Sequence, residues 1–174
     1  MAGLHLTGEK RVPVRLVDVG VGVDARTASL RLCVSPAQAA FVAPVAFYLA
    51  MCDDAESPWR PFAVERDGAV VGFVMTAVDP TDNSMNIGGL IIDVHHQRRG
   101  TGTATVHALI ERARTARCHL VALAYAPENA AARAVYARLG FVETGEKDGN
   151  EVIAQLDLCP PDSRRDYGLR NKQP

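Results

Sequence analysis

Long hydrophobic runs, a surplus of one charge and clustered cysteines are all missing from this sequence of 174 residues. No apolar stretch approaches the roughly 18 consecutive residues that a membrane-spanning helix needs, and the amino terminus lacks a basic segment followed by an apolar signal core. We therefore expect a cytoplasmic protein with no membrane partner. A formal net charge of −1 also disfavours a nucleic-acid binder, because such proteins usually carry a basic surplus or stripe.

Metal ligands are not grouped in the chain. The four cysteines are scattered, at Cys33, Cys52, Cys118 and Cys159. Without a C-x-x-C pair they predict reduced thiols, not a zinc site or a disulfide framework. His95 and His96 are adjacent, so in an extended segment they would point to opposite faces. No metal site is expected.

The most informative segment is the glycine-rich Q-R-R-G-T-G at residues 97–102, which joins a strand-like run to a helix-like run. Gly100 and Gly102 allow the backbone to come close to a ligand, and the first N–H groups of the following helix lack intrahelical partners and favour an anion. Arg98 and Arg99 add charge with a geometry that suits phosphate oxygens. The segment therefore predicts phosphate binding. Neither G-x-x-x-x-G-K-S/T nor G-x-G-x-x-G fits, which disfavours nucleotide hydrolysis and hydride transfer.

Two motifs in sequence order carry a family resemblance. Gln97, Gly100 and Gly102 match the pattern Q/R-x-x-G-x-G/A, and residues 128–141 match N-x-x-A-x-x-x-Y-x-x-x-G-F. Together they resemble the pyrophosphate loop and a later helix of the GNAT superfamily of acyl-CoA-dependent N-acetyltransferases. The similarity extends over roughly residues 12–158. Within the superfamily it is closest to the bacterial spermine/spermidine (diamine) acetyltransferase-like group.

The resemblance implies the GNAT fold, an α/β (α+β) arrangement. Its features are a central mixed, largely antiparallel twisted sheet, a splayed parallel strand pair and flanking helices. We expect one such domain at residues 12–158, after a flexible lead-in at 1–11 and before a polar tail at 159–174 that is disordered or docks on a partner chain. Many relatives dimerise, so the resemblance leaves a homodimer open.

Apolar periodicity and turn residues predict an order of elements that agrees with this fold. The expected elements are a strand at 12–17, two short helices within 30–51, hairpin strands at 62–65 and 69–78, a strand at 85–94 weakened or bulged at Gly88-Gly89, a helix beginning near Thr103, a strand at 119–125, a helix that ends before Gly140, and two strands within 141–158.

Acetyl-coenzyme A is the cofactor that the resemblance implies. The backbone of the central strand would pair with its pantetheine arm, the loop would bind its pyrophosphate, and one asparagine side chain would contact the arm. The residues are Leu90, Ile91 and Ile92 for the strand, Gln97, Arg98, Arg99, Gly100, Thr101, Gly102 and Thr103 for the loop, and Asn129 for the side-chain contact. An alternative for Asn129 is a helix N-cap, for which Asn is among the best residues.

Tyr136 carries the catalytic role that the resemblance implies, as the general acid that protonates the departing thiolate of coenzyme A. A phenol has a reference pKa of about 10 and a thiol about 8.5, so the transfer is chemically reasonable. The alternative is that Tyr136 only packs on the buried face of its helix, where Ala132 and Leu139 share the helical spacing.

A carboxylate is missing where many relatives place one, because residues 86–89 and 121–124 contain neither Asp nor Glu. An amine with a pKa near 10 must lose a proton before it attacks, so a water chain or a carboxylate from the substrate side would have to serve. Candidates for that side, with solvated acidic loops as the alternative, are Asp53, Asp54, Glu56, Asp79 and Asp82. The pair Gly88-Gly89 suggests room for a bulkier acceptor.

The implied function is an acetyl-CoA-dependent N-acetyltransferase that acts on a primary amine of a small molecule. The partner would be a polyamine, an amine-bearing antibiotic or another metabolite, which attacks the thioester directly. Two alternatives stay open. One is a protein or peptide N-acetyltransferase, and the other is a non-catalytic acyl-CoA-binding module, which the missing carboxylates suggest.

Overall fold

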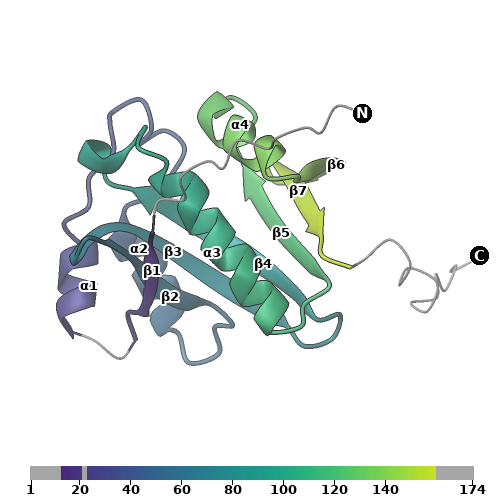
Figure 1. The fold of residues 1–174 in the computed structure, drawn as a ribbon, viewed down its shortest axis with the longest axis horizontal. Helices are drawn as coiled ribbons and strands as arrows, with labels where there is room; N and C mark the ends of the chain where they lie inside the picture. Colours follow the sequence, from purple (N-terminus) through teal and green to yellow (C-terminus); the bar gives the residue numbers. More distant parts are fainter. Residues whose placement is uncertain (1–12, 21–22, 160–174) are drawn as a thin grey trace, which may run out of the picture.

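The computed structural model describes residues 13–20 and 23–159. They form a seven-stranded sheet in the order β1-β2-β3-β4-β5-β7-β6, with helices on both faces (Figure 1). The predicted lead-in at 1–11 and the predicted tail beyond Cys159 lie outside the described residues.

The elements follow one another in this order: β1 (Arg15–Asp18), α1 (Val23–Ser29), α2 (Val45–Asp53), β2 (Arg60–Arg66), β3 (Ala69–Asp79), β4 (Ser84–Ile92), the 3-10 turn η1 (Val94–His96), α3 (Thr101–Thr115), β5 (Leu120–Tyr125), α4 (Ala130–Arg138), β6 (Val142–Asp148) and β7 (Glu151–Asp157). Neighbouring strands are antiparallel except β4 and β5. The predicted mixed, largely antiparallel sheet with one parallel pair and flanking helices is therefore confirmed.

The prediction of two helices within residues 30–51 was wrong. Only α2 lies there, and α1 comes earlier, at Val23–Ser29. Pro44 has an extended backbone, with ψ of 148°, and directly precedes α2. This position suits proline, because it has no N–H and is tolerated at the start of a helix but not in its interior. The short helix α1 is supported by an ion pair from Arg26 to Asp53 in α2, a contact between segments that local patterns do not reveal.

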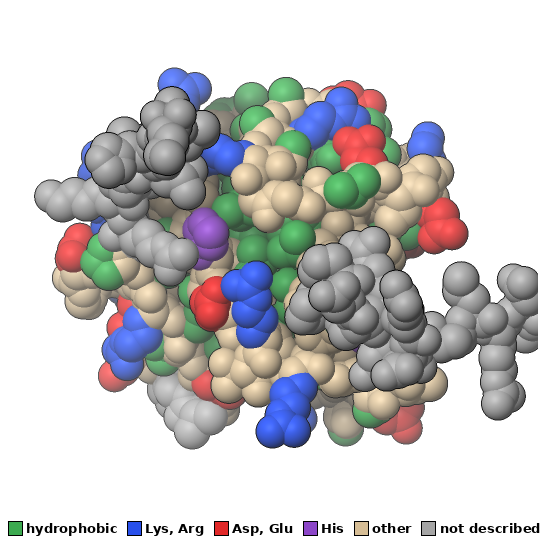
Figure 2. All heavy atoms as spheres, turned by 45° about the vertical axis from the view of Figure 1, so that its right-hand side comes forward, with side chains coloured by type: hydrophobic (Ala, Val, Ile, Leu, Met, Phe, Trp, Pro, Cys, Tyr) green, Lys and Arg blue, Asp and Glu red, His purple; other side chains and the backbone are tan. Residues whose placement is uncertain are grey.

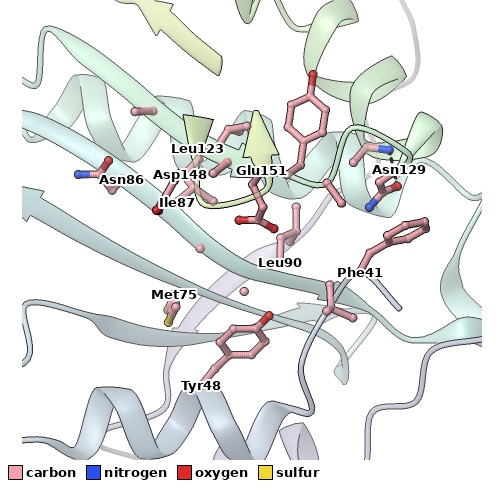
Figure 3. Close-up of a pocket in the computed structure, with 18 of the residues that line it drawn as sticks. Phe41, Tyr48, Met75, Asn86, Ile87, Leu90, Leu123, Asn129, Asp148 and Glu151 are labelled. Atoms are coloured by element: carbon pink, nitrogen blue, oxygen red, sulfur yellow. Dashed lines mark hydrogen bonds between the residues drawn. The ribbon is translucent and has the colours of Figure 1, made fainter. Parts of the chain in front are cut away.

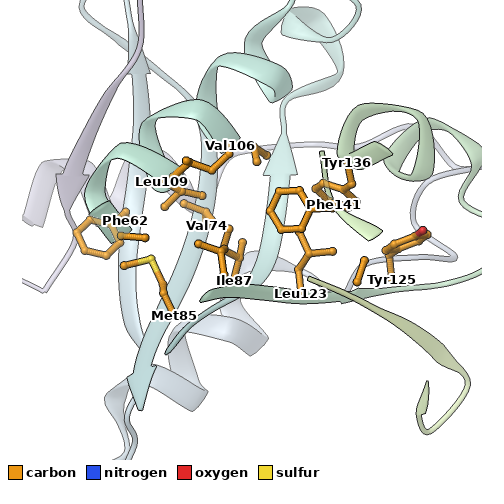
Figure 4. Packing of buried hydrophobic residues seen from close by; sticks show 14 of the residues in the cluster. Phe62, Val74, Met85, Ile87, Val106, Leu109, Leu123, Tyr125, Tyr136 and Phe141 are labelled. Atoms are coloured by element: carbon orange, nitrogen blue, oxygen red, sulfur yellow. The ribbon is translucent and has the colours of Figure 1, made fainter. Parts of the chain in front are cut away.

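Side chains of the central strands alternate between two hydrophobic clusters. On β2, Phe62 and Val64 face the cluster with α3 and α4, whereas Ala63 faces the cluster with α1 and α2. Figure 4 shows Val106 and Leu109 of α3 packing over this first face of the sheet. The sheet is thus buried on both sides at its centre, which accounts for the nearly continuous apolar runs of its inner strands.

Turns and a bulge shape the sheet where the sequence indicated. The β2–β3 turn contains Asp67 and Gly68, both with positive φ, as a two-residue hairpin turn requires. In the pairing of β3 with β4, Met75 lies opposite Gly88 and Phe73 opposite Ile91, so β4 carries an extra residue. Gly89 lies in this bulge, with φ of 60°, and the predicted irregularity is confirmed.

The parallel pair separates partway along its length. The pairing of β4 with β5 runs from Ser84 and Leu120 to Ile87 and Leu123, and ends there. Within the described residues, no strand pairs with residues 88–92 on the side that faces β5. The middle of the sheet therefore opens at the carboxyl ends of its two parallel strands.

Candidate active site

The loop between β4 and α3 presents unpaired backbone N–H groups. Arg98 and Gly100 both have left-handed backbones, with φ of 57° and 77°, and α3 begins at Thr101. The first helical bond runs from Ala104 N to Gly100 O, so within the described residues the N–H groups of 101–103 have no acceptor. Such groups at the N-terminus of a 15-residue helix can donate hydrogen bonds to an anion such as phosphate.

Side-chain hydrogen bonds hold this loop in place. Gln97 Nε2 donates to Ile92 O at 2.8 Å, and Thr101 Oγ1 donates to His96 O at 3.1 Å. Arg66 Nη1 donates to Thr101 Oγ1 at 3.2 Å. Gln97 and Thr101 therefore hold the shape of the loop with their side chains, a contribution that the motif alone did not indicate.

A cavity of about 780 Å³ opens over the loop. It is lined by ten of the eleven residues predicted to contact the cofactor: Leu90, Ile91, Ile92, Gln97, Arg98, Gly100, Thr101, Gly102, Thr103 and Asn129. Arg99 is not part of this lining, and its carbonyl oxygen accepts a bond from Arg66 instead.

Arg138 is a cation of this cavity that the sequence analysis missed. Its Nη2 donates to Thr103 Oγ1 at 2.8 Å, and its side chain lines the cavity beside the N-terminus of α3. The two residues are 35 positions apart and lie on different helices. No local pattern could have brought them together.

A second cavity, of about 460 Å³, is drawn in Figure 3. Both are lined by Leu90, Asn129 and Tyr136, so these residues lie where the two cavities join. The second cavity has an apolar wall of residues from 41–59 and Met75, and two carboxylates from the β6–β7 turn.

Tyr136 is packed and lines both cavities at once. It is 8% exposed, and its ring lies 5.4 Å from that of Tyr125 and 5.8 Å from that of Phe141, measured between centroids. Burial, more than the neighbouring Tyr125 and Glu151, raises the pKa of the Tyr136 phenol above its ordinary value. Within the described residues its hydroxyl has no hydrogen-bond partner. The group is therefore a protonated donor at the junction.

Asn129 fills the N-cap role that was its alternative. Its Oδ1 accepts a bond from Ala132 N at 3.1 Å, at the start of α4. The side chain also lines both cavities. With its oxygen engaged, the amide group has its NH₂ donors left for a ligand.

Asp148 and Glu151 supply the carboxylates of the second cavity. They are cross-strand partners at the β6–β7 turn, and Figure 3 shows the Glu151 carboxylate directed into the cavity toward Leu90. Burial, followed by the negative charge of Asp148, raises the pKa of Glu151. Sequence reasoning missed both, because only the fold brings this turn beside β4.

The acidic residues expected on the substrate side lie elsewhere. Asp53 pairs with Arg26, and three others cap turns through backbone N–H groups: Asp54, Asp79 and Asp82. Neither these four nor Glu56 lines either cavity. Local interactions explain most of this acidic set, which agrees with the alternative of solvated acidic loops.

The space beside Gly88 and Gly89 is already filled. A Cβ on Gly88 would lie 2.9 Å from Met75 Cε and 3.1 Å from the Trp59 ring, and one on Gly89 would lie 3.0 Å from the Tyr48 ring. The glycines make room for these side chains and not for a bulkier acceptor. The aromatic rings packed on the bare backbone form the apolar wall of the second cavity.

The loop at the N-terminus of α3 and the separating parallel strands β4 and β5 lead to a comparison of the protein with known families. Residues 30–141 match the acetyltransferase (GNAT) family, which is more than half of the chain. The chain belongs to this family and is an acyltransferase. The predicted family is thereby confirmed, whereas the closer likeness to diamine acetyltransferases is not established.

Several solved structures share the fold. One is the ribosomal-protein-S18-alanine N-acetyltransferase from Escherichia coli, with 21% identity, a TM-score of 0.62, and coverage of 87% of this chain and 97% of the other. A spermidine N-acetyltransferase chimera from Vibrio cholerae and hSSAT has 20% identity, a TM-score of 0.60, and coverage of 83% and 93%. Mycobacterium smegmatis RimJ in complex with CoA-disulfide has 24% identity, a TM-score of 0.54, and coverage of 66% and 60%. Among curated proteins, none is significantly similar in sequence.

Two further features concern only the part of the chain that the structure describes. No helix there has the length and apolar character needed to cross a membrane. No group of three or more His, Cys, Asp or Glu residues there is arranged to hold a metal ion.

Proposed function

We propose that the protein transfers an acetyl group from acetyl-CoA to a primary amine of a small molecule. The observation that carries the proposal is the junction of two cavities at Tyr136. One cavity has the unpaired N–H groups of α3 at its far end, and the other has carboxylates that can attract an amine. Polyamines are one acceptor class to test, because a spermidine acetyltransferase chimera shares the fold. That likeness concerns the fold alone and does not assign the substrate.

The residues of the larger cavity fit coenzyme A. The N–H groups of 101–103 would hold its pyrophosphate, and Arg98 and Arg138 would add positive charge beside it. The edge of β4 at residues 88–92, which has no strand partner on its β5 side within the described residues, offers backbone groups to a strand-like pantetheine arm. The Asn129 amide would donate to the same arm.

Proton handling falls to two side chains of this chain. Bound acyl-CoA supplies the acyl group as a thioester: the C–N bond to the amine forms, the C–S bond breaks, the amine releases a proton and the sulfur takes one up. Tyr136 holds a proton at its Oη, where burial keeps the phenol un-ionised, and donates it toward the sulfur. Glu151 holds the ammonium and accepts its proton, either directly or through water.

A thiol-release assay tests the proposal. Purified protein is given acetyl-CoA with a panel of amines and, separately, short peptides, and free coenzyme A is measured. We expect release that depends on an amine. The Tyr136→Phe variant should lose about 100-fold in kcat while keeping the thermal shift that coenzyme A gives the wild type.

Other outcomes point to the alternatives. Release with peptides alone would favour a protein N-acetyltransferase. A thermal shift with coenzyme A but no release with any acceptor would favour a binding module. Equal kcat in the wild type and in Tyr136→Phe would remove Tyr136 from the mechanism.

A further inference from the structure

We propose that the acceptor is an amine carried on an apolar or aromatic body, of the arylalkylamine class. Its ammonium is held by Glu151 and Asp148, and its body lies against the apolar wall that α2 presents. This inference rests on the proposed function and names the substrate class of the same site.

The carboxylates form one pole of the cavity. Asp148 and Glu151 are paired across the antiparallel strands β6 and β7, so their side chains leave the same region of the sheet. Within the described residues neither side chain forms an ion pair or a hydrogen bond. Glu151 is partly buried and Asp148 is exposed. These two like charges lack a counter-charge within the described residues, and a protonated amine supplies one.

A polar group independent of these carboxylates faces the same space. The Tyr136 hydroxyl is on a residue that is 92% buried, since its exposed fraction is 8%, and it has no partner in the described part of the chain. The oxygen itself is not fully buried, because no fully buried side-chain nitrogen or oxygen of the described residues lacks a partner. Tyr136 and Glu151 both line this cavity. A ligand between them would satisfy both.

The apolar wall forms the other pole. Phe47 and Met51 lie one turn apart on α2, are 56% and 37% exposed, and line the cavity together with Phe41, Tyr48 and Trp59. Large apolar side chains that remain exposed at the mouth of a cavity mark a surface that binds an apolar group. The volume of about 460 Å³ suits a small molecule.

Charge distribution separates this class from linear polyamines. Among the residues that the structure describes, Asp148 and Glu151 are the only acidic side chains in the lining of this cavity. A second ammonium several methylenes away would lie against the aromatic wall, where only cation–π attraction is on offer. Removing that second ammonium from water costs free energy. An uncharged body avoids this cost and buries apolar surface against the wall.

The test compares matched amines by kcat/KM with saturating acetyl-CoA: 2-phenylethylamine, propylamine, putrescine and spermidine. We expect 2-phenylethylamine to exceed each of the others by at least about tenfold, as apolar groups in pockets discriminate. Replacing Phe47 and Met51 together by Ala should reduce this preference to about threefold or less. Leu30→Ala, which removes an exposed apolar side chain that lines neither cavity, should leave it unchanged.

Carboxylate variants test the other pole. Glu151→Gln should lower kcat/KM for all four amines by about tenfold or more, while Glu146→Gln, an exposed carboxylate on β6 outside the cavity, should not. An unaltered thermal shift with coenzyme A shows that each variant is folded.

Three results would overturn the inference. Faster turnover of putrescine or spermidine than of 2-phenylethylamine would do so and leave the proposed function standing. Turnover of peptides with an aromatic first residue, but of no free amine, would replace the small-molecule acceptor by a chain terminus. Coenzyme A binding without thiol release for any acceptor would overturn the inference and the proposed function together.

Discussion

Tyr136, at the junction of the cavities, and Glu151, in the second cavity, differ in how readily they lose a proton. Burial raises the pKa of Tyr136 and keeps its proton in place, whereas Glu151 is only partly buried and has a carboxyl whose pKa rises from a low ordinary value. In the proposed mechanism the first group donates a proton and the second accepts one. Titratable groups whose environments set them apart in this way are typical of acid–base sites.

Activity should depend on pH through the carboxyl group of Glu151. Burial and then the charge of Asp148 raise the pKa of Glu151, and Glu151 must be ionised to accept a proton. Activity should therefore fall as the pH drops through this raised pKa. Asp148→Asn removes the neighbouring charge, so the acid limb of kcat/KM should move to lower pH by a few tenths of a unit up to about one unit. The measurement is kcat/KM against pH for both enzymes with one acceptor, so that ionisation of the amine affects both equally. An acid limb that stays in place would exclude Glu151 as its origin.

At the scale of elements, the β2–β3 hairpin reaches across to the anion-binding loop. Arg66, the last residue of β2, donates to Thr101 Oγ1 at 3.2 Å and to Arg99 O at 3.4 Å. Thr101 is itself 1% exposed at the start of α3. The hairpin therefore positions the loop without lining its cavity.

Arg66→Ala should weaken binding of acetyl-CoA more than it slows the chemical step. Losing two hydrogen bonds of about 1 kcal/mol each leaves the loop less ordered, so KM for acetyl-CoA should rise about three- to tenfold with little change in kcat. Steady-state kinetics with varied acetyl-CoA measure both values. Arg15→Ala removes a cation that pairs with Glu65 on the same hairpin, and it should leave KM unchanged. A similar rise in both variants would indicate a general effect of charge and not support of the loop.

Close packing of β3 on β4 leads to a prediction about stability. A Cβ on Gly72 would lie 2.6 Å from Ile91 O and 2.8 Å from Ile92 Cδ1, and the first of these atoms is backbone. Gly72→Ala should therefore reduce the free energy of unfolding by about 2 kcal/mol. Gly102→Ala is the control, because its Cβ would lie 3.8 Å from Ile92 Cγ1, at ordinary contact distance. Chemical denaturation measures both, and a Gly72→Ala variant as stable as Gly102→Ala would contradict the packing argument.

Local chemistry explains which elements the sequence could predict. The Asp67-Gly68 turn, the bulge at Gly89 and the stop at Gly140 each depend on a positive φ that glycine readily adopts, so the residues themselves indicated them. The helix α1 did not follow from its own residues, because a contact with α2 supports it. The cofactor loop could be found from its motif, but Arg138 and Glu151 could not, since only tertiary packing brings them to the cavities.

At the scale of the whole molecule, the site joins the two halves of the core. Leu90 packs against the cluster beneath α3, and the next residue, Ile91, belongs to the cluster beneath α1 and α2. Figure 2 shows acidic and basic side chains interspersed over the face that it presents, with no stripe of one sign. The local donors of the loop, with Arg98 and Arg138 beside them, are placed to attract an anionic ligand.

Because the site contacts both halves of the core, ligand binding should stabilise the entire fold. The phosphates of coenzyme A should account for most of this stabilisation. A ligand at 100 times its Kd adds about 2.7 kcal/mol to the free energy of unfolding, which corresponds to a rise in Tm of roughly 5–10 °C for a domain of this size. Coenzyme A should give such a rise, while pantetheine at the same concentration, which lacks the phosphates, should give almost none.

Arg138→Ala removes a cation beside the N-terminus of α3 and should reduce the shift by several degrees, whereas Arg114→Ala, on the last turn of α3, should not. Differential scanning fluorimetry at two salt concentrations measures the two ligands with the wild type and with both variants. The shift with coenzyme A should shrink at high salt because the contacts are electrostatic. Equal shifts for coenzyme A and pantetheine would mean that the arm and not the loop dominates binding, and the unpaired N–H groups of residues 101–103 would then need another ligand.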